Sequence, residues 1–343
     1  MSRTGVELKP AWQTVPPSVR QAVEGILGAP VRRAMRVWGG YGPTPTYRLR
    51  LADGRRAFFK GVNPDSNPFM RAAYGRELRV YRELAGLIAG WAPAFYGAFA
   101  RDDWSVMLLE DLGRKNVPPW TPRLAAGIAQ AFGRFHASTL GIPLPEWLPR
   151  PTAQTVGPAL LWQGAQDPAW RQSLADLAGA RSVEARHWLV ESIPTLTTAS
   201  RRLTETGPPF ALIHWDLRSD NLRWVRGRLY LLDWPHAGAG HPEVDAAAFA
   251  QSVTVEGGPL PEAVMAWYAE AMPVRSELVD AAVASIAGFF ADLAWGQENP
   301  ELPRLRAFQR RQLKVTLAWA ARRLDLPDPT WLDAIPEATQ NAR

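Results

Sequence analysis

The most constraining feature of this sequence is a short polar motif, followed closely by an apolar run that ends in aspartate. His214, Asp216 and Asn221 have the spacing H-x-D-x-x-x-x-N, and Asp233 ends the apolar run twelve residues after Asn221. The 343 residues include 5 His, 16 Asp and 6 Asn, so a chance match to the first motif is expected on the order of 0.004 times. The arrangement therefore requires a chemical explanation.

These residue types suit phosphoryl transfer from a nucleotide. A carboxylate such as Asp216 can accept a hydrogen bond from an acceptor hydroxyl and align it with the γ-phosphate of ATP. Asn221 and Asp233 offer oxygen ligands, which Mg²⁺ prefers in proteins. The motif therefore predicts a kinase that uses ATP as co-substrate and Mg²⁺ as cofactor.

A kinase also needs a lysine for the α- and β-phosphates and an acid that orients this lysine. Lys60 lies at the end of a predicted strand, in a chain with 35 Arg and only 4 Lys, and Glu77 lies in the next predicted helix. Taken alone, each is better explained as a surface charge, and Glu83 is a rival acid. Their order ahead of the Asp216 motif favours a nucleotide site.

The stretch 38–44 precedes the first clear strand and is a candidate phosphate loop. Gly40 and Gly42 would let backbone N–H groups approach phosphate oxygens. Pro43 and Pro45 each remove a donor N–H, so an ordinary Gly/Pro turn is the alternative.

Apolar periodicity divides the chain into a β-rich part and a helical part. Strands are expected in two hairpins of the first part, and one further hairpin is expected at 222–233. The expected helices lie at 18–28, 70–87, from 121 on, and near 169–180, 183–205, 262–271, 276–296 and 304–324. We predict an α+β, protein-kinase-like fold of two lobes. Residues 1–112 would form a nucleotide-binding lobe of a small antiparallel sheet plus a helix, with a hinge at its end. Residues 113–343 would form a mostly helical catalytic and substrate lobe.

Composition excludes several other classes. The chain has no cysteine and no signal-peptide pattern at its start, which favours the cytoplasm. The most apolar run, Ala281 to Ala291, is too short to span a bilayer, so no membrane partner is expected. The net charge is +6, but the basic residues are scattered without a Lys/Arg block. A solvated surface is therefore favoured over a nucleic-acid site.

The motifs resemble those of the aminoglycoside phosphotransferase family, bacterial small-molecule relatives of protein kinases. The family pattern is close to H-G-D-L-x-x-x-N, then an apolar residue with Asp and Trp or Phe, then Asp-apolar-Ala. The matching segments are 214–221, 232–234 and 245–247, and a looser resemblance extends over residues 30–325. Trp215 stands where the family often has glycine.

The resemblance implies further roles. The backbone from Glu110 to Leu112 would contact adenine, and Arg218 would clamp the γ-phosphate unless it is a surface arginine. His214 would brace the catalytic loop, and Asp245 would bond back to that loop.

Three other histidines are expected to have no chemical role. His136 is best explained as a packing residue on its helix. His236 and His241, together with Glu243, lack the spacing of metal ligands.

The acceptor is expected to be a small molecule. Only 11 residues separate Asp233 from Asp245, which leaves no room for the long activation segment with which a protein kinase docks a peptide. An aminoglycoside-like antibiotic would need carboxylates, for which Asp292, Glu298 and Glu301 are candidates, whereas the 16 Trp suit a neutral or aromatic metabolite equally well. The main alternative function is a catalytically silent kinase fold that binds or regulates.

Overall fold

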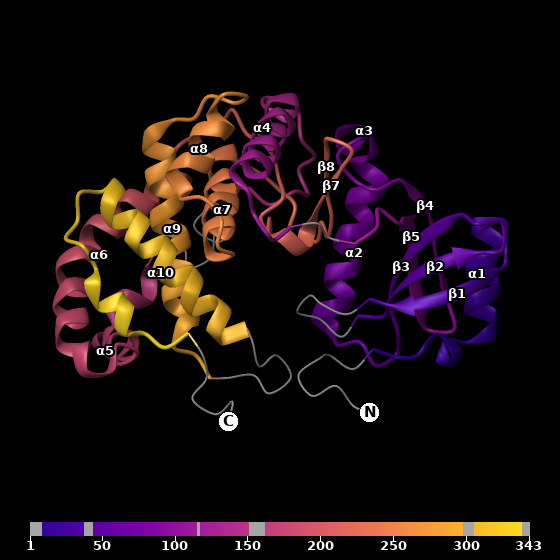
Figure 1. Cartoon of the computed structure of the whole chain (residues 1–343), viewed down its shortest axis with the longest axis horizontal. Helices are drawn as coiled ribbons and strands as arrows, with labels where there is room; N and C mark the ends of the chain where they lie inside the picture. The colour runs from indigo at the N-terminus through magenta and orange to yellow at the C-terminus, as the bar shows by residue number, and fades with distance from the viewer. Residues whose placement is uncertain (1–8, 38–43, 115–116, 151–161, 298–304, 338–343) are drawn as a thin grey trace. The chain divides into compact units, whose positions relative to one another are not determined.

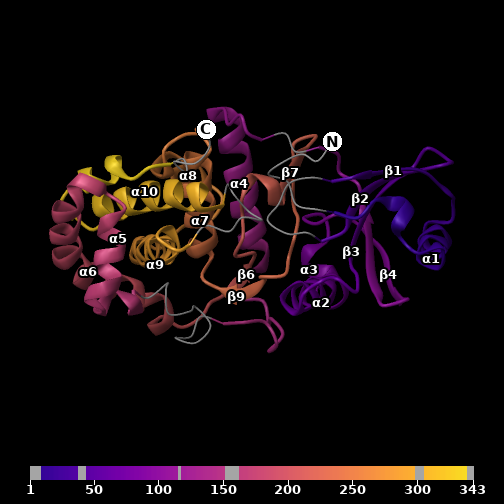
Figure 2. The same cartoon turned by 90° about the horizontal axis from the view of Figure 1, so that it is seen from below.

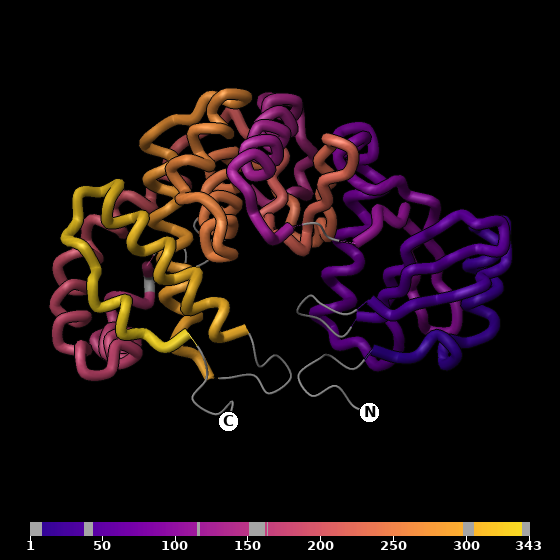
Figure 3. Tube along the Cα trace, viewed as in Figure 1, coloured from indigo at the N-terminus to yellow at the C-terminus, as the bar shows by residue number. Residues whose placement is uncertain are grey.

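The computed structural model describes residues 9–37, 44–114, 117–150, 162–297 and 305–337. The chain divides into two compact units (Figure 1). The first comprises Met1–Asn116 and Asp220–His236, and the second comprises Val117–Ser219 and Ala237–Arg343. The hairpin at 220–236 belongs to the first of these units. Figure 3 traces the path of the chain.

In its described residues the first unit contains a five-stranded antiparallel sheet with the order β1-β2-β3-β5-β4. Helices α1 and α2 lie on opposite sides of this sheet (Figures 1 and 2). A separate hairpin is formed by β7 and β8. The elements of the unit are α1 (Pro17–Leu27), β1 (Val31–Arg36), β2 (Thr46–Leu51), β3 (Arg56–Val62), α2 (Pro68–Glu83), α3 (Ala85–Ile88), β4 (Phe95–Arg101), β5 (Trp104–Glu110), β7 (Leu222–Val225) and β8 (Arg228–Leu231).

The two faces of this sheet differ because side chains alternate along each strand. Tyr47, Phe59 and Trp104 point to the α1 side and pack edge to face in a core with the apolar residues of α1. Since Phe59 points into this core, its neighbour Lys60 points to the opposite face, where α2 supplies Glu77. The alternation of strand β3 therefore places a lysine beside an acidic helix residue.

The second unit is mostly helical. Its long helix α9 is buried along most of its length and contacts α6, α7 and α10, while α4 packs against α8 and α7 (Figure 2). A short antiparallel ladder is formed by β6 and β9. The elements are α4 (Pro122–Thr139), α5 (Pro168–Asp176), α6 (Ser182–Glu205), β6 (Ala211–Ile213), β9 (Gly238–Gly240), α7 (Pro242–Val255), α8 (Pro261–Ala269), α9 (Ser276–Ala294) and α10 (Leu305–Arg323).

The structure confirms the α+β class and the predicted helices and hairpins, but three features differ. Strand β1 and the β6–β9 ladder were not expected, and neither was helix α7. Nearly every residue of α7 is buried, so its sequence lacks the one-sided apolar pattern by which a surface helix is predicted. Among the described residues, no helix is both long and apolar enough to cross a bilayer.

Candidate active site

The first unit brings three of the predicted residues together around one ammonium group. Lys60 Nζ lies 2.5 Å from Glu77 Oε2 and 2.6 Å from Asp233 Oδ1. Glu83, the rival acid, instead pairs with Arg79 on the surface. The side chain of Glu77 is 2% exposed, whereas that of Asp233 is 44% exposed. One carboxylate thus holds the lysine from the interior, and the other remains accessible to a ligand.

Burial controls the electrostatics of this cluster. It lowers the pKa of Lys60, but the charges of Asp233 and Glu77 outweigh this effect, so the pKa lies above that of an ordinary lysine. Burial raises the pKa of Glu77 to about 7, against the lowering effect of Lys60. Lys60 is therefore a permanent cation, and Glu77 changes its charge near neutral pH.

The hairpin β7–β8 brings the two predicted metal ligands, Asn221 and Asp233, to the same end of the hairpin. Leu222 pairs with Leu231, and the N–H of Leu232 donates to the carbonyl of Asn221 at 2.7 Å. Asp233 follows directly, in a left-handed conformation with φ of 62°. Mg²⁺ usually takes one or two protein ligands and completes its shell with phosphate and water. An amide and a partly exposed carboxylate fit that requirement. Within the described residues no group of three or more His, Cys, Asp or Glu could hold a metal by itself.

The predicted adenine-binding segment follows strand β5. The N–H of Glu110 donates to the carbonyl of Ala94 at 2.8 Å, so this N–H already has a hydrogen-bond partner. Arg48 pairs with the buried Asp111 at 3.3 Å, and Asp111 accepts from the N–H of Gly113 at 2.9 Å. These bonds hold the backbone on both sides of Leu112. Gly40 and Gly42, the candidate phosphate-loop glycines, lie outside the described residues.

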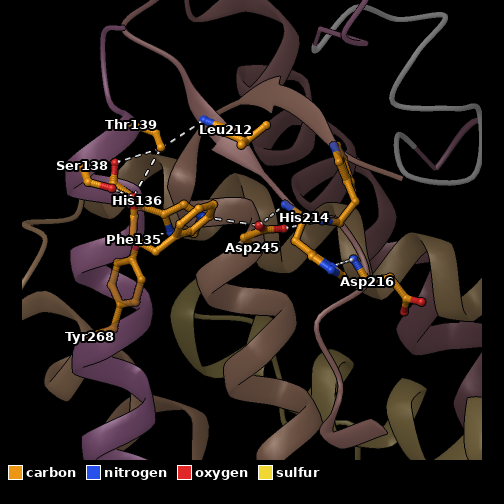
Figure 4. Close-up of polar contacts among 10 residues, drawn as sticks. Phe135, His136, Ser138, Thr139, Leu212, His214, Asp216, Asp245 and Tyr268 are labelled. Atoms are coloured by element: carbon orange, nitrogen blue, oxygen red, sulfur yellow. Dashed lines mark hydrogen bonds and ion pairs between the residues drawn. The ribbon is translucent and has the colours of Figure 1, made fainter. Parts of the chain in front are cut away.

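The second unit contains the predicted catalytic loop, here residues 214–219, which follows strand β6. Arg218 Nε lies 2.9 Å from Asp216 Oδ1, and its Nη2 donates to Oδ2 at 3.2 Å. Figure 4 shows Asp216 beside His214, whose Nδ1 accepts from the N–H of Asp216 at 3.4 Å. His214 is fully buried, which fits a brace rather than a proton carrier. Asp216 itself is partly exposed.

Asp245 of α7 holds the beginning of this loop. Its Oδ1 accepts from the N–H of Trp215 at 2.8 Å, and its Oδ2 accepts from the N–H of His214 (Figure 4). A carboxylate on a buried helix thus satisfies two consecutive backbone donors, as predicted for Asp245. Trp215 has a φ of 67°, the left-handed region that favours glycine. Its indole has room because a Cβ on Gly238 would lie 3.1 Å from Trp215 Nε1.

Glu256, at the other end of α7, holds the end of the loop. It accepts a hydrogen bond from the hydroxyl of Ser219 at 2.6 Å and another from the indole N–H of Trp120 at 2.8 Å. Asp245 and Glu256 are eleven residues apart, which is close to three turns and places them on the same side of the helix. Glu256 was not predicted from the sequence, because no local motif marks an acid that accepts hydrogen bonds from a distant serine and a distant tryptophan.

A Glu256→Gln substitution tests this anchor. We expect a loss of stability of about 1–2 kcal/mol, because one of the two donors loses a charged acceptor. Urea unfolding at neutral pH measures the change. The double variant with Ser219→Ala should lose less than the sum of the two single variants. Strict additivity would show that the two side chains do not interact.

Two further predictions concern histidines. His241 Nδ1 accepts from Arg275 at 3.1 Å, and the same arginine pairs with Glu243 at 3.0 Å. Burial lowers the pKa of His241, and the positive charge of Arg275 adds to this effect. Both His241 and Glu243 are thus engaged by an arginine. His136 packs on Phe132, as predicted, and it is also hydrogen bonded at both ring nitrogens.

Among the candidate acceptor carboxylates, Asp292 accepts a hydrogen bond from the indole of Trp170 at 3.0 Å. The backbone carbonyls of the next two residues of α9 accept hydrogen bonds from Arg306 and Arg310. Glu298 and Glu301 lie outside the described residues.

A comparison with known protein families identifies the family of this chain. The sequence matches the profile of the phosphotransferase enzyme family over residues 34–278, and the chain belongs to this family. A comparison with curated proteins found no match.

Solved structures share the fold at low sequence identity. The spectinomycin phosphotransferase APH(9)-Ia is 12% identical, with a TM-score of 0.56 over 89% of this chain and 98% of that one. Choline kinase LicA from Streptococcus pneumoniae is 15% identical, with a TM-score of 0.52 over 90% and 98%. The amicoumacin kinase hAmiN is 12% identical, with a TM-score of 0.50 over 93% and 94%.

Proposed function

We propose that this phosphotransferase is an ATP- and Mg²⁺-dependent kinase that transfers the γ-phosphate to a hydroxyl of a small molecule. The observation that carries the proposal is the ammonium of Lys60 between Glu77 and Asp233, with Asn221 at the same end of the hairpin as Asp233. A lysine held by a buried acid is the phosphate-binding device of kinases, and the two oxygen ligands suit Mg²⁺.

The chain's own residues have distinct roles in this proposal. Lys60 binds the α- and β-phosphates, and the backbone from Glu110 to Leu112 receives adenine. Asp216 accepts the hydrogen bond of the acceptor hydroxyl and orients its oxygen toward the γ-phosphorus. As the new O–P bond forms, the bond from the γ-phosphorus to the β,γ-bridging oxygen breaks, ADP leaves, and the hydroxyl proton passes to Asp216. Arg218, held on Asp216 by two contacts, is the proposed partner of the transferred phosphoryl group.

Magnesium is the proposed cofactor. When bound, it would neutralise the charge of the β- and γ-phosphate oxygens, and Asn221 and Asp233 would hold it. Among the similar structures, the amicoumacin kinase contains AMP-PNP and Ca²⁺, which supports a nucleotide with a divalent cation.

A small acceptor is supported by the segment between Asp233 and Asp245. The short strand β9 and the first turn of α7 already occupy residues 238–245, so this segment has no room for a peptide-docking insert. The similar structures include enzymes named for spectinomycin, amicoumacin and choline, and hence for unlike molecules. An aminoglycoside-like antibiotic and a hydroxyl-bearing metabolite are both candidate acceptors. We propose ATP and such an acceptor as partners.

A silent kinase fold is the second candidate function. Such proteins usually lack the lysine, the base or a metal ligand, whereas Lys60, Asp216, Asn221 and Asp233 are all present. The intact set favours catalysis.

The test is turnover of Mg²⁺-ATP by the purified chain against a panel of hydroxyl compounds. The panel should contain aminoglycosides, macrolides, sugars, choline and homoserine, with ADP release and the mass of the product as readouts. We expect one class of acceptor to gain one phosphoryl group. ATP binding without any phosphorylated product would support the silent alternative. A chain that does not bind ATP would contradict the roles given to Lys60, Asn221 and Asp233.

A further inference from the structure

A chain of buried hydrogen bonds runs through three helices of the second unit to the catalytic loop. The Tyr268 hydroxyl on α8 lies 2.6 Å from His136 Nδ1 on α4. His136 Nε2 lies 3.3 Å from Asp245 Oδ2 on α7, and Asp245 holds the N–H groups of His214 and Trp215 (Figure 4). None of Tyr268, His136 and Asp245 is more than 1% exposed.

Close packing of two helices makes the first of these bonds possible. A Cβ on Gly133 would lie 2.8 Å from the backbone oxygen of Tyr268, closer than side-chain carbons approach. Glycine at this position lets α4 approach α8, and His136 follows one turn later on the same face of α4. Phe132 and Phe135 enclose the imidazole on its apolar sides.

The donors and acceptors along the chain determine the state of the imidazole. Burial raises the pKa of Tyr268 well above its usual range, and the charges of Glu243 and Asp245 add to this effect. The phenol therefore keeps its proton, and we assign its O–H as the hydrogen-bond donor to His136 Nδ1. The other ring nitrogen, Nε2, then carries the hydrogen and donates to Asp245, which as a carboxylate can only accept. An imidazole with its hydrogen on Nε2 gives every group in the chain a hydrogen-bond partner.

We propose that Tyr268 and His136 are positioning residues for the catalytic loop. Tyr268 selects the tautomer of His136, and His136 orients the Asp245 carboxylate toward the N–H groups of His214 and Trp215. Those residues directly precede Asp216. The link to catalysis rests on the proposed function, whereas the link to loop order does not.

Removal of the Tyr268 hydroxyl tests the proposal. In Tyr268→Phe, His136 Nδ1 loses its donor, and the ring can adopt the tautomer that turns a lone pair toward Asp245. We expect the amide hydrogens of His214 and Trp215 to exchange about fivefold faster, which corresponds to the loss of one ordinary hydrogen bond. We also expect kcat to fall about fivefold while KM for ATP stays unchanged.

Tyr47→Phe is the matched control. It removes another buried tyrosine hydroxyl, which donates to the carbonyl of Pro10 at 2.8 Å in the first unit. Exchange of the 213–215 amides and kcat should both stay at the wild-type level in this variant. A general loss of stability would instead affect both variants alike.

Each result has a definite meaning. Faster exchange at His214 and Trp215 in Tyr268→Phe alone supports the positioning role, even if no acceptor for the wild-type enzyme is found. Unchanged exchange in Tyr268→Phe overturns it. Faster exchange with an unchanged kcat overturns the link to catalysis. Long-range ¹H–¹⁵N spectra of the five imidazoles give a second check, since His136 must carry its hydrogen on Nε2 in the wild type.

Discussion

An Asp216→Asn substitution is expected to reduce phosphoryl transfer by about 10³-fold, within the range typical of general acid–base residues. Asparagine keeps the shape of the side chain but cannot take a proton from the acceptor hydroxyl. The substitution also removes the charge that holds Arg218 at 2.9 Å. Stopped-flow or steady-state measurement of ADP release with the best acceptor of the panel gives the rate.

Two comparisons make this result specific to the chemistry. ATP affinity should change little, because adenine, the α- and β-phosphates and the magnesium are all assigned to residues of the first unit. Asp280→Asn is the matched control, since Asp280 also pairs with an arginine, Arg323, at 2.6 Å in the second unit. Its rate should equal that of the wild type. If Asp216→Asn keeps its turnover, Asp216 is not the base, and a different residue or no residue accepts the proton.

The second large effect is expected from Lys60→Met, which leaves the buried carboxylate of Glu77 without its cation. At pH 8.5 the loss of stability should be about 3 kcal/mol, in the range found when one partner of a buried ion pair is removed. At pH 5.5 it should be about 1 kcal/mol, because Glu77 is then protonated and only a hydrogen bond is lost. Phosphoryl transfer should fall strongly at both pH values, since the phosphates lose their cation.

The pH dependence follows from the direction of the pKa shift of Glu77. Burial raises the pKa of Glu77 from 4.5 to about 7, so the folded chain binds this proton more tightly than the unfolded chain does. The stabilisation provided by this tighter proton binding is fully present below pH 4.5 and is lost as the pH rises through 7. Without Lys60 the pKa of Glu77 rises further. The difference in stability between Lys60→Met and the wild type must therefore grow as the pH increases.

The double variant Lys60→Met, Glu77→Gln is the control for this experiment. It removes the buried charge together with its partner, so the steep loss of stability between pH 5.5 and 8.5 should disappear. Chemical denaturation at four or more pH values measures all three proteins. A Lys60→Met penalty that is constant with pH would show that Glu77 does not ionise within this range.

The order of residues along the chain was sufficient to predict which polar groups lie together when those groups are close in sequence. Asn221 and Asp233 flank one short hairpin, so their juxtaposition follows from the pairing of β7 with β8. Lys60 and Glu77 were also found by order, because a strand followed by a helix leaves few positions for the acid. The choice between Glu77 and Glu83 agreed with the structure, in which Glu83 pairs with Arg79 instead.

The anchors of the catalytic loop could not be found in this way, with the exception of Asp245. Helix α7 is buried on nearly every side and lacks the periodicity of a surface helix, so neither the helix nor the role of Glu256 was predicted. Tyr268 lies 132 residues from His136 along the chain, and no local pattern relates the two.

The sequence by itself thus indicated the family and the α+β class, and it supplied the residues proposed for the phosphate and metal chemistry. These depend on short motifs whose members are close along the chain or in a constrained order. Only the tertiary structure decided which buried groups besides Asp245 hold the catalytic loop. Those contacts arise when elements far apart in sequence pack together, and burial then requires each polar group to find a partner.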